Sequence, residues 1–247
     1  MTEQEQVPTA IVTGAGGGIG SAIARQFAAD GFQVVAVDLS AERVDALAAS
    51  TSGIKAVSAD VSTPDGVETA LSAAESRVFA VCNSAGVGDG GASVEELNDE
   101  LWNRVIRINL SAIYLMTNRA VPLMIEAGGG VIVNISSVAG LRGGRAGAAY
   151  TASKWGVVGL SQNVASSVGG EGVRCHAICP SRITGKVALS QGVTRTPKGI
   201  FRAERDTGRP GPGTPSNVAD LASFLVSEKA THLNGLAIPA DAGWLAF

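Results

Sequence analysis

The chemistry that this sequence can perform is indicated first by Tyr150 and Lys154, which lie four residues apart in the segment AYTASKWGVVGL. On a helix, this spacing places a phenol and an ammonium group on the same face. A free phenol has a pKa of about 10, so only about one in a thousand is ionised at neutral pH. A fixed cation beside the phenol favours the phenolate and brings the group into range for proton transfer. The pair therefore predicts a general acid or base in which Lys154 lowers the pKa of Tyr150.

The elements that must position these groups are indicated by seven short apolar segments. Each is rich in apolar or β-branched residues and is bounded by Gly, Asp, Ser or Pro, as buried parallel strands are. Amphipathic stretches such as SAIARQFAAD and AERVDALAAS separate them. This alternation predicts an α/β fold with a single doubly wound parallel seven-stranded sheet, Rossmann-like, and helices on both faces. The seven segments are TAIVTG, QVVAVDL (33–39), IKAVSADV (54–61), VFAVCNSAG (78–86), GVIVNISS (130–137), VRCHAICP (173–180) and LAIPAD (236–241).

Two longer segments depart from this alternation. The stretch ELWNRVIRINLSAIYLMTNRAVPLMIEA is apolar on more than one face, which predicts a long helix buried against a partner subunit as well as against the sheet. We therefore expect a homo-oligomer, either a tetramer or a dimer. Residues 184–215 are polar and rich in Gly and Pro, and they predict a substrate lid within one domain that spans residues 1–247. A solvated surface excursion is the alternative interpretation of this insert.

A glycine-rich turn, TGAGGGIG (13–20), follows the first predicted strand. Its glycines let the backbone approach a ligand closely, and the helix that begins there presents free N–H groups to a pyrophosphate. Asp38 ends the second strand, where its carboxylate would accept from both hydroxyls of an adenosine ribose and repel a 2′-phosphate. No Lys or Arg occurs among residues 14–20 and Leu39 follows the acid, so the pattern favours NAD over NADP. A turn-capping role is the alternative for Asp38.

The composition disfavours several other functions. A formal net charge of −3 and a pI near 5.5 argue against a nucleic-acid binder, which usually presents a basic face. Three Cys are too few for a disulfide framework, and no cluster has metal-ligand spacing, so we expect no metal. The first residues are polar and no apolar run reaches membrane-spanning length, which favours a cytoplasmic protein without a membrane partner. No nucleophile-elbow motif is present, which weakens the case for a hydrolase.

Four motifs follow one another in order: TGAGGGIG (13–20), NSAG (83–86), SSVAG (136–140) and YTASK (150–154). Together they resemble the short-chain dehydrogenase/reductase family, and the likeness extends from Thr13 to the DAGW at 241–244. The resemblance implies an enzyme that transfers a hydride between NAD and a secondary alcohol or ketone.

The resemblance also implies individual catalytic roles. Tyr150 would be the general acid in carbonyl reduction or the base in alcohol oxidation, and Lys154 would also hydrogen-bond the nicotinamide ribose. Ser137 would hold the substrate oxygen, and Asn109 would hold a water molecule for proton relay. Each residue has a structural alternative, because Ser and Asn favour caps and turns. Ser137 could cap a strand end, and Asn109 could satisfy the backbone at a kink in a buried helix.

Further residues would contact the coenzyme by the same resemblance. Asp60 and Val61 would meet the adenine ring, and Asn83, Ala85 and Gly86 would shape the wall beside the adenosine ribose. The chain departs from the family pattern after the sixth strand, where the expected threonine position holds Gly185 and Thr184 lies one residue early. The expected NAD-binding residues are Gly14, Gly18, Ile19, Gly20, Asp38, Asp60, Val61, Asn83, Ala85, Gly86, Tyr150, Lys154, Pro180, Ile183 and Thr184.

The substrate is indicated only by charge. Between residues 185 and 209 the chain carries six Lys or Arg against two acidic residues, and Arg145 lies between Ser137 and Tyr150. We therefore expect a small-molecule alcohol or carbonyl substrate that bears a carboxylate, a phosphate or a thioester carrier and contacts Ser137 and Arg145. A solvated charged face is the alternative. Rival functions are a 3-oxoacyl-thioester reductase that uses NADPH, a non-catalytic dinucleotide-sensing module, and a scaffold whose long helix serves only assembly.

Overall fold

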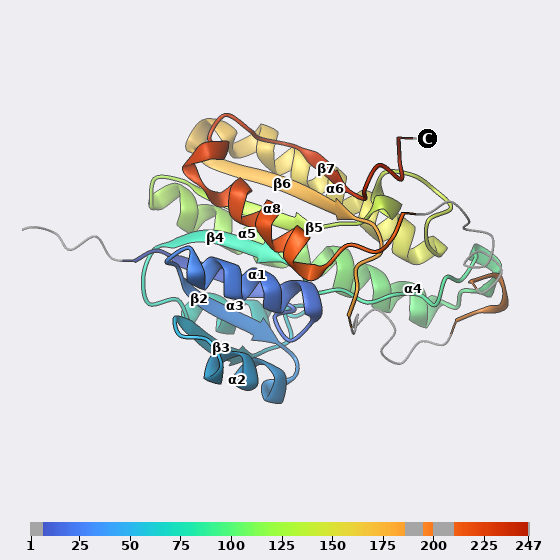
Figure 1. The fold of residues 1–247 in the computed structure, drawn as a ribbon, viewed down its shortest axis with the longest axis horizontal. Helices are drawn as coiled ribbons and strands as arrows, with labels where there is room; N and C mark the ends of the chain where they lie inside the picture. The colour runs from blue at the N-terminus through green and yellow to red at the C-terminus, as the bar shows by residue number, and fades with distance from the viewer. Residues whose placement is uncertain (1–6, 186–194, 200–209, 247) are drawn as a thin grey trace, which may run out of the picture.

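The computed structural model describes residues 7–185, 195–199 and 210–246. Within these residues, seven strands form one parallel sheet in the order β3-β2-β1-β4-β5-β6-β7 (Figure 1). The predicted fold class is therefore confirmed. The strands are β1 Thr9–Thr13, β2 Gln33–Asp38, β3 Ile54–Ser58, β4 Val78–Asn83, β5 Gly130–Ile135, β6 Val173–Pro180 and β7 Ala237–Ala240.

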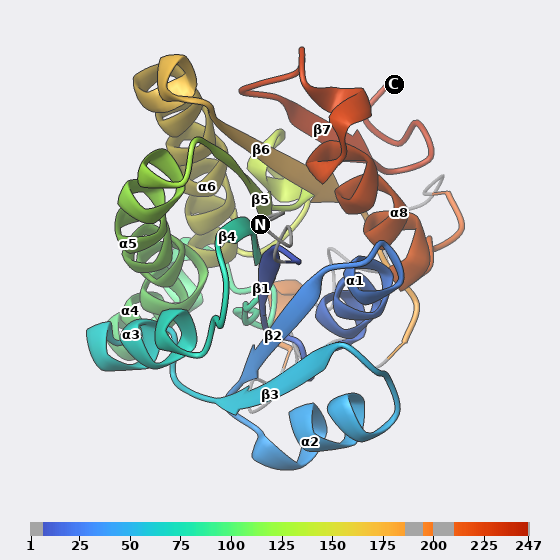
Figure 2. The same cartoon turned by 90° about the vertical axis from the view of Figure 1, so that its left-hand side faces the viewer.

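Helices cover both faces of the sheet (Figure 2). One face is covered by α1 Gly18–Ala29, α2 Ala41–Ala49 and α8 Pro215–Val226. The other face is covered by α3 Pro64–Ser72, α5 Ala112–Glu126 and α6 Ala148–Val168, and α4 Asp99–Ile106 packs against α6 on the same side. The segment between β3 and β4 is short, and its helix α3 has only nine residues.

The central strands β1, β4, β5 and β6 are largely apolar because both of their faces are buried. In β1, Ala10 and Val12 enter the core beneath α1 and α8, whereas Ile11 enters the core beneath α3 and α5. Alternate residues of a strand point to opposite faces, so a strand covered on both sides has no polar face to present. The same division holds in β5, where Val131 and Ile132 lie in different cores.

The predicted long helix is interrupted by a π-helical turn. Helix α4 begins after Asn98, whose side chain accepts from the Leu101 N–H at 2.8 Å. The π turn at Arg107–Ser111 follows, and α5 continues from it. The sequence pattern predicted one long helix here, with a kink at Asn109 as an alternative, and the π turn lies at that residue. Such π turns are rare in helices and often lie at functional sites.

Several large apolar side chains on this half of the molecule are exposed in the single chain: Trp102 on α4, Tyr114 and Leu123 on α5, and Trp155 on α6. Their exposure agrees with the expectation that this face packs against a partner subunit. The oligomeric state itself stays a prediction. Among the described residues, no helix combines the length and the apolar character that crossing a membrane requires.

The sheet order reverses between β1 and β4, and this sets the place of the site. The chain leaves β1 for one side of the sheet and leaves β4 for the other, so a crevice forms beyond their carboxyl ends. Of the predicted lid, Thr184, Gly185 and residues 195–199 and 210–215 are described. The remainder, including four of its six basic residues, lies outside the described residues.

Candidate active site

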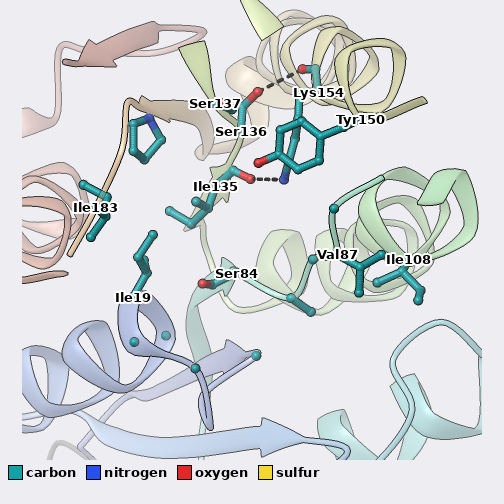
Figure 3. A pocket seen from close by; sticks show the side chains of 18 of the residues that line it. Ile19, Ser84, Val87, Ile108, Ile135, Ser136, Ser137, Tyr150, Lys154 and Ile183 are labelled. Atoms are coloured by element: carbon teal, nitrogen blue, oxygen red, sulfur yellow. Dashed lines mark hydrogen bonds between the residues drawn. The ribbon is translucent and has the colours of Figure 1, made fainter. Parts of the chain in front are cut away.

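A cavity of about 670 Å³ opens at the carboxyl ends of the central strands. Its walls come from the turn after β1, the ends of β2 and β5, the segments after β3, β4 and β6, and the first turn of α6 (Figure 3). This volume lies in the range of cofactor and small-molecule sites. Within the described part of the chain, no group of three or more His, Cys, Asp or Glu could hold a metal ion.

The glycine-rich turn requires glycine for steric reasons. Gly14 has a φ of +66°, and a Cβ there would lie 2.7 Å from the Ala85 nitrogen. A Cβ on Gly20 would lie 2.2 Å from the Gly14 carbonyl oxygen. Gly18 begins α1, and the N-cap residue before it makes no side-chain hydrogen bond to the first turn. The amides at this end are therefore suited to an anion such as a pyrophosphate, and Ile19 lines the cavity beside them.

Asp38 lies at the end of β2 with its carboxylate on the cavity wall. One oxygen accepts from the Gly16 N–H at 3.0 Å and the other from the Ser40 N–H at 3.0 Å. Arg43, on the first turns of α2, lines the same end of the cavity. The sequence reasoning considered only residues 14–20 and 39 and so missed this cation. Asp38 is placed to repel a 2′-phosphate, whereas Arg43 is placed to attract one.

The expected adenine contacts lie beside this end of the cavity. Asp60 and Val61 both line it. The Asp60 carboxylate accepts from the backbone N–H and the hydroxyl of Ser62 at 2.9 and 2.6 Å, and it lies 3.8 Å from the Arg107 guanidinium. Asp60 therefore forms a turn through these bonds, and it also borders the cavity.

The segment after β4 is placed partly as expected. Ala85 and Gly86 line the cavity, but Asn83 does not belong to its wall. The Asn83 side chain is buried in the sheet, where its amide nitrogen donates to the Asn134 side-chain oxygen at 2.8 Å. Asn83 therefore supports the wall from behind instead of facing a ligand.

Tyr150 and Lys154 lie one turn apart near the start of α6 and both line the cavity (Figure 3). The Lys154 nitrogen is 5.6 Å from the centroid of the Tyr150 ring. That nitrogen donates to the Ile135 carbonyl oxygen at 2.8 Å, which anchors the lysine to the end of β5. Both side chains are buried, Lys154 being only 3% exposed.

The electrostatics of this pair differ from the sequence expectation. Burial raises the pKa of Tyr150 to about 12; a hydrogen bond with Ser137 opposes this rise and the charge of Asp89 adds to it. Burial lowers the pKa of Lys154 to about 8. The predicted lowering of the tyrosine pKa is therefore wrong for the protein without a ligand. The sequence showed the cation beside the phenol but not the depth at which both groups are buried, and burial disfavours both charged forms.

Two adjacent serines follow β5 and have different partners. Ser137 faces the Tyr150 phenol, and its oxygen also accepts from the Ala139 N–H at 3.2 Å. Ser136 donates to the Lys154 main-chain oxygen at 2.9 Å. This second bond holds α6 against the end of β5. Ser137 therefore combines its cap with a place beside the phenol, whereas Ser136 has a structural role.

Asn109 lies in the π turn and is fully buried. Its side chain accepts from the Val87 N–H at 2.8 Å and donates to the Val87 carbonyl oxygen at 2.9 Å and to the Ser153 hydroxyl at 3.1 Å. The helix irregularity thus places an amide that joins the segment after β4 to α6, the element that carries Tyr150. These contacts agree with the structural alternative considered for Asn109, and a water-holding role stays a prediction.

The segment after β6 closes another side of the cavity. Pro180, Ile183 and Thr184 all line it. Ile183 is buried and forms a parallel bridge with Gly213, and the Thr184 N–H donates to the Gly213 carbonyl oxygen at 2.7 Å. Thr184 therefore borders the cavity despite its displacement by one residue.

The described part of the predicted lid docks on the segment between β4 and α4. The Thr196 N–H donates to the Gly90 carbonyl oxygen at 3.2 Å. Glu96 accepts from the Thr196 hydroxyl at 2.9 Å and from the Lys198 N–H at 3.2 Å. Its hydrogen bonds lower the pKa of Glu96 to about 2, and the bond from the Ser93 backbone has the largest effect. Arg195 and Gly199 also line the cavity, and the role of this segment as a lid stays a prediction.

Besides Arg43, three residues of the site were missed or only partly foreseen. Asp89 is a buried carboxylate on the cavity wall that sequence reasoning passed over, although its setting in Gly-Asp-Gly-Gly is a turn signal. Trp244 also lines the cavity, and the Arg145 guanidinium carbon lies 4.2 Å from the centroid of its ring. Arg145 was expected near the substrate, and the structure places it on the cavity wall.

Comparison with known proteins gives consistent results. The family model described as short chain dehydrogenase matches residues 8–194. The chain is 36% identical over 250 residues to 3beta-hydroxysteroid dehydrogenase 2 of Eggerthella lenta, covering 97% of this chain and 95% of that protein.

Two solved structures are similar over almost their whole lengths. One is a 3-ketoacyl-(acyl-carrier-protein) reductase of Brucella melitensis complexed with NADH, with a TM-score of 0.83, 30% identity, and coverage of 96% of this chain and 97% of that one. The other is described as an NAD(P)-dependent gluconate 5-dehydrogenase of Beutenbergia cavernae, with bound NADP at low occupancy. It has a TM-score of 0.84 and 33% identity, and the match covers 97% of each chain.

Proposed function

The chain belongs to the short-chain dehydrogenase family, and from that premise we propose that it transfers a hydride between NAD and a secondary alcohol or ketone, with Tyr150 as general acid or base. Members of this family are oxidoreductases that use a nicotinamide dinucleotide. The observation that carries the proposal is the meeting of Tyr150, Lys154 and Ser137 on one wall of a cavity whose other end has a glycine-rich helix N-terminus. The cavity has both a place for an anionic dinucleotide and a proton-transfer group.

The chain's own residues supply position and proton transfer. When bound, the nicotinamide supplies or accepts the hydride. The Tyr150 hydroxyl would give a proton to the carbonyl oxygen during reduction, and the Tyr150 phenolate would take a proton from the alcohol during oxidation. Ser137 holds that oxygen through a hydrogen bond. Lys154 would hold a positive charge beside the phenol ring and is held in place by the Ile135 carbonyl.

The pKa values indicate how the pair responds to pH. With a pKa of about 12, the phenol keeps its proton at neutral pH, which suits a general acid. Lys154, with a pKa of about 8, is mostly cationic at pH 7 and loses its charge in mildly alkaline solution. Because the ammonium form favours the phenolate, we propose that the role of base in alcohol oxidation depends on the charged lysine.

Substitution of the phenol tests the central role. Tyr150→Phe should abolish turnover on a panel of alcohols and ketones and should leave dinucleotide binding largely intact, because the ring and its packing remain. Ser137→Ala should reduce turnover by about 10²- to 10⁴-fold with the same effect on binding, the range found for groups that assist proton transfer. If Tyr150→Phe retained turnover, or lost binding instead, the assignment would be wrong.

We propose NAD in preference to NADP on the strength of Asp38 at the end of β2. Arg43 supports the opposite preference, so the two residues are tested separately. Titration with NADH and NADPH should show tighter NADH binding by the unsubstituted protein. Asp38→Ala should reduce this preference and Arg43→Ala should increase it. Tighter NADPH binding by the unsubstituted protein would instead favour the rival 3-oxoacyl-thioester reductase.

The substrate proposal rests on the charged side chains that line the cavity. Arg104, Arg145, Arg182 and Arg195 line it together with Lys154, against Asp89. We propose a substrate with an anionic group and Arg145 as one of its contacts. Kinetic comparison of charged and neutral ketones, with Arg145→Ala as the variant, tests this. Equal discrimination by both proteins would remove Arg145 from the proposal.

A non-catalytic dinucleotide-sensing module is the alternative from another class. The gathered Tyr150, Lys154 and Ser137 side chains favour catalysis over sensing, because sensing needs no proton donor beside the ligand. Dinucleotide binding without turnover on any member of a broad panel would favour the sensor.

A further inference from the structure

Asp89 connects the segment after β4 to the helix that carries Tyr150. One oxygen of its carboxylate accepts from the Tyr150 backbone N–H at 2.8 Å, and the other accepts from the Gly91 N–H at 3.0 Å. A second bond joins the same two segments, since the Ala148 N–H donates to the Ala92 carbonyl oxygen at 2.8 Å. Asp89 is only 2% exposed and lines the cavity.

The carboxylate acts as a helix cap that comes from a distant part of the chain. The first four N–H groups of a helix have no partner within the helix. Gly147, the N-cap residue of α6, has no side chain with which to satisfy them. A negative charge at this position also interacts favourably with the helix dipole. Asp89 therefore supplies both the acceptor and the charge that the local sequence lacks.

Gly147 shows that this contact is built into the packing. A Cβ on Gly147 would lie 2.4 Å from both carboxylate oxygens of Asp89. Any residue other than glycine would displace the carboxylate from the helix end. The pairing of an acid at 89 with glycine at 147 is thus a steric requirement.

The charge also acts on the phenol. Asp89 disfavours ionisation of Tyr150, in opposition to the Ser137 hydrogen bond. Asp38 and Asp60, the other acids on the described cavity wall, lie at the ends of β2 and β3. Four charged or titratable groups lie around Tyr150: Lys154 from α6, Arg145 from the loop before α6, Asp89, and Cys179 from β6. Three further cations, Arg104, Arg182 and Arg195, also line the cavity.

We propose that Asp89 is a positioning residue for the reaction, which caps the first turn of α6 and places a negative charge next to the Tyr150 backbone. This inference rests on the proposed role of Tyr150. Its direct consequence is that a neutral residue at 89 makes the phenol ionise at lower pH.

The test uses a spectroscopic titration that needs no substrate. The sequence contains two tyrosines, so Tyr114→Phe on the exposed face of α5 leaves Tyr150 as the only phenol. In that background, Asp89→Asn keeps the shape and one acceptor but removes the charge. The absorbance of the tyrosinate should then appear roughly 0.5–1 pH unit lower, the size expected for one charge at several ångströms. Asp89→Ser, a smaller neutral acceptor, should shift the titration in the same direction.

A matched control separates charge from helix capping. Asn98→Ala removes the cap of α4, whose amide oxygen accepts from Leu101, and it should lower the melting temperature without moving the titration. The pH dependence of alcohol oxidation should move to lower pH in Asp89→Asn and stay unchanged in Asn98→Ala. An unchanged titration in Asp89→Asn would refute the role of Asp89. Absence of turnover in the unsubstituted protein would refute the proposed function instead, so the two failures are distinguishable.

Discussion

Replacing Lys154 with methionine should make the ligand-free protein more stable at pH 7, although it should abolish activity. The lysine is 3% exposed, and burial lowers its pKa from an ordinary value of 10.5 to about 8. Each pH unit of such a difference corresponds to about 1.4 kcal/mol, so keeping the buried ammonium costs the fold about 3 kcal/mol at neutral pH. Methionine has a similar unbranched shape and carries no charge.

The net gain should be smaller than this cost. The Ile135 carbonyl loses the hydrogen bond that it accepts from Lys154, which costs about 1 kcal/mol. We expect a gain of about 1–2 kcal/mol in the free energy of unfolding, which is a rise of roughly 2–8 °C in Tm for a domain of this size.

The pKa of Lys154 also predicts how the stability difference between the two proteins changes with pH. The folded state disfavours the charged lysine, so the cost is fully present below pH 8 and disappears as the pH rises through 10.5. In urea denaturation at pH 7, Lys154→Met should therefore have a higher free energy of unfolding than the unsubstituted protein. This difference should shrink above pH 8 and reverse by about 1 kcal/mol near pH 10.5, where only the lost hydrogen bond to Ile135 remains.

A surface substitution provides the control for this experiment. Lys55→Met removes an exposed lysine that pairs with Glu75 at 2.7 Å, and it should change stability by less than about 1 kcal/mol at either pH. If Lys154→Met were less stable than the unsubstituted protein at pH 7, other groups would have to stabilise the buried ammonium. The claim that its burial destabilises the fold would then be wrong.

Three further predictions concern other buried groups. His176 in β6 is fully buried and burial lowers its pKa to about 4, so the free energy of unfolding should fall as the pH drops from about 6.5 towards 4. His176→Leu should reduce that fall, as measured by urea denaturation at pH 7 and pH 4.5. Gly20→Ala should lower Tm by several degrees and weaken dinucleotide binding because its Cβ would meet the Gly14 carbonyl at 2.2 Å, whereas Gly143→Ala, with nothing within 4 Å, should change neither. A thiol reagent should label no cysteine of the native protein within minutes and all three after unfolding, because burial raises the pKa of Cys82, Cys175 and Cys179; rapid native labelling would contradict the depth of these strands.

The sequence predicted what depends on local spacing. The strands were foreseen because each is a short apolar run with polar ends, and Tyr150 and Lys154 because a helix turns once in about four residues. Ser137 was found because it lies in a recognisable motif close before Tyr150. These features need no knowledge of which distant segments meet.

What the sequence could not predict depends on contacts between distant segments. Asp89 and Tyr150 are 61 residues apart, so no local pattern links them. Arg43 reaches the cavity only because α2 turns back along β2. The pKa of Tyr150 was predicted with the wrong sign because burial and the charge of Asp89 depend on tertiary packing. Asn109 marked an irregular helix, but an apolar pattern does not distinguish a π turn from an α turn.

The π turn at Arg107–Ser111 has a consequence for changes of chain length. A π turn contains one residue more than an α turn, so deletion of a single residue there would restore a regular helix. Because the wider turn accommodates the extra residue within nearly the same rotation, the positions after it would keep nearly the same direction around the axis. Met116, Ala120 and Met124 would still face the sheet, whereas the Asn109 amide, which the wide turn places, would lose its bonds to Val87 and Ser153. The loss of one codon there should therefore disturb the site more than the core.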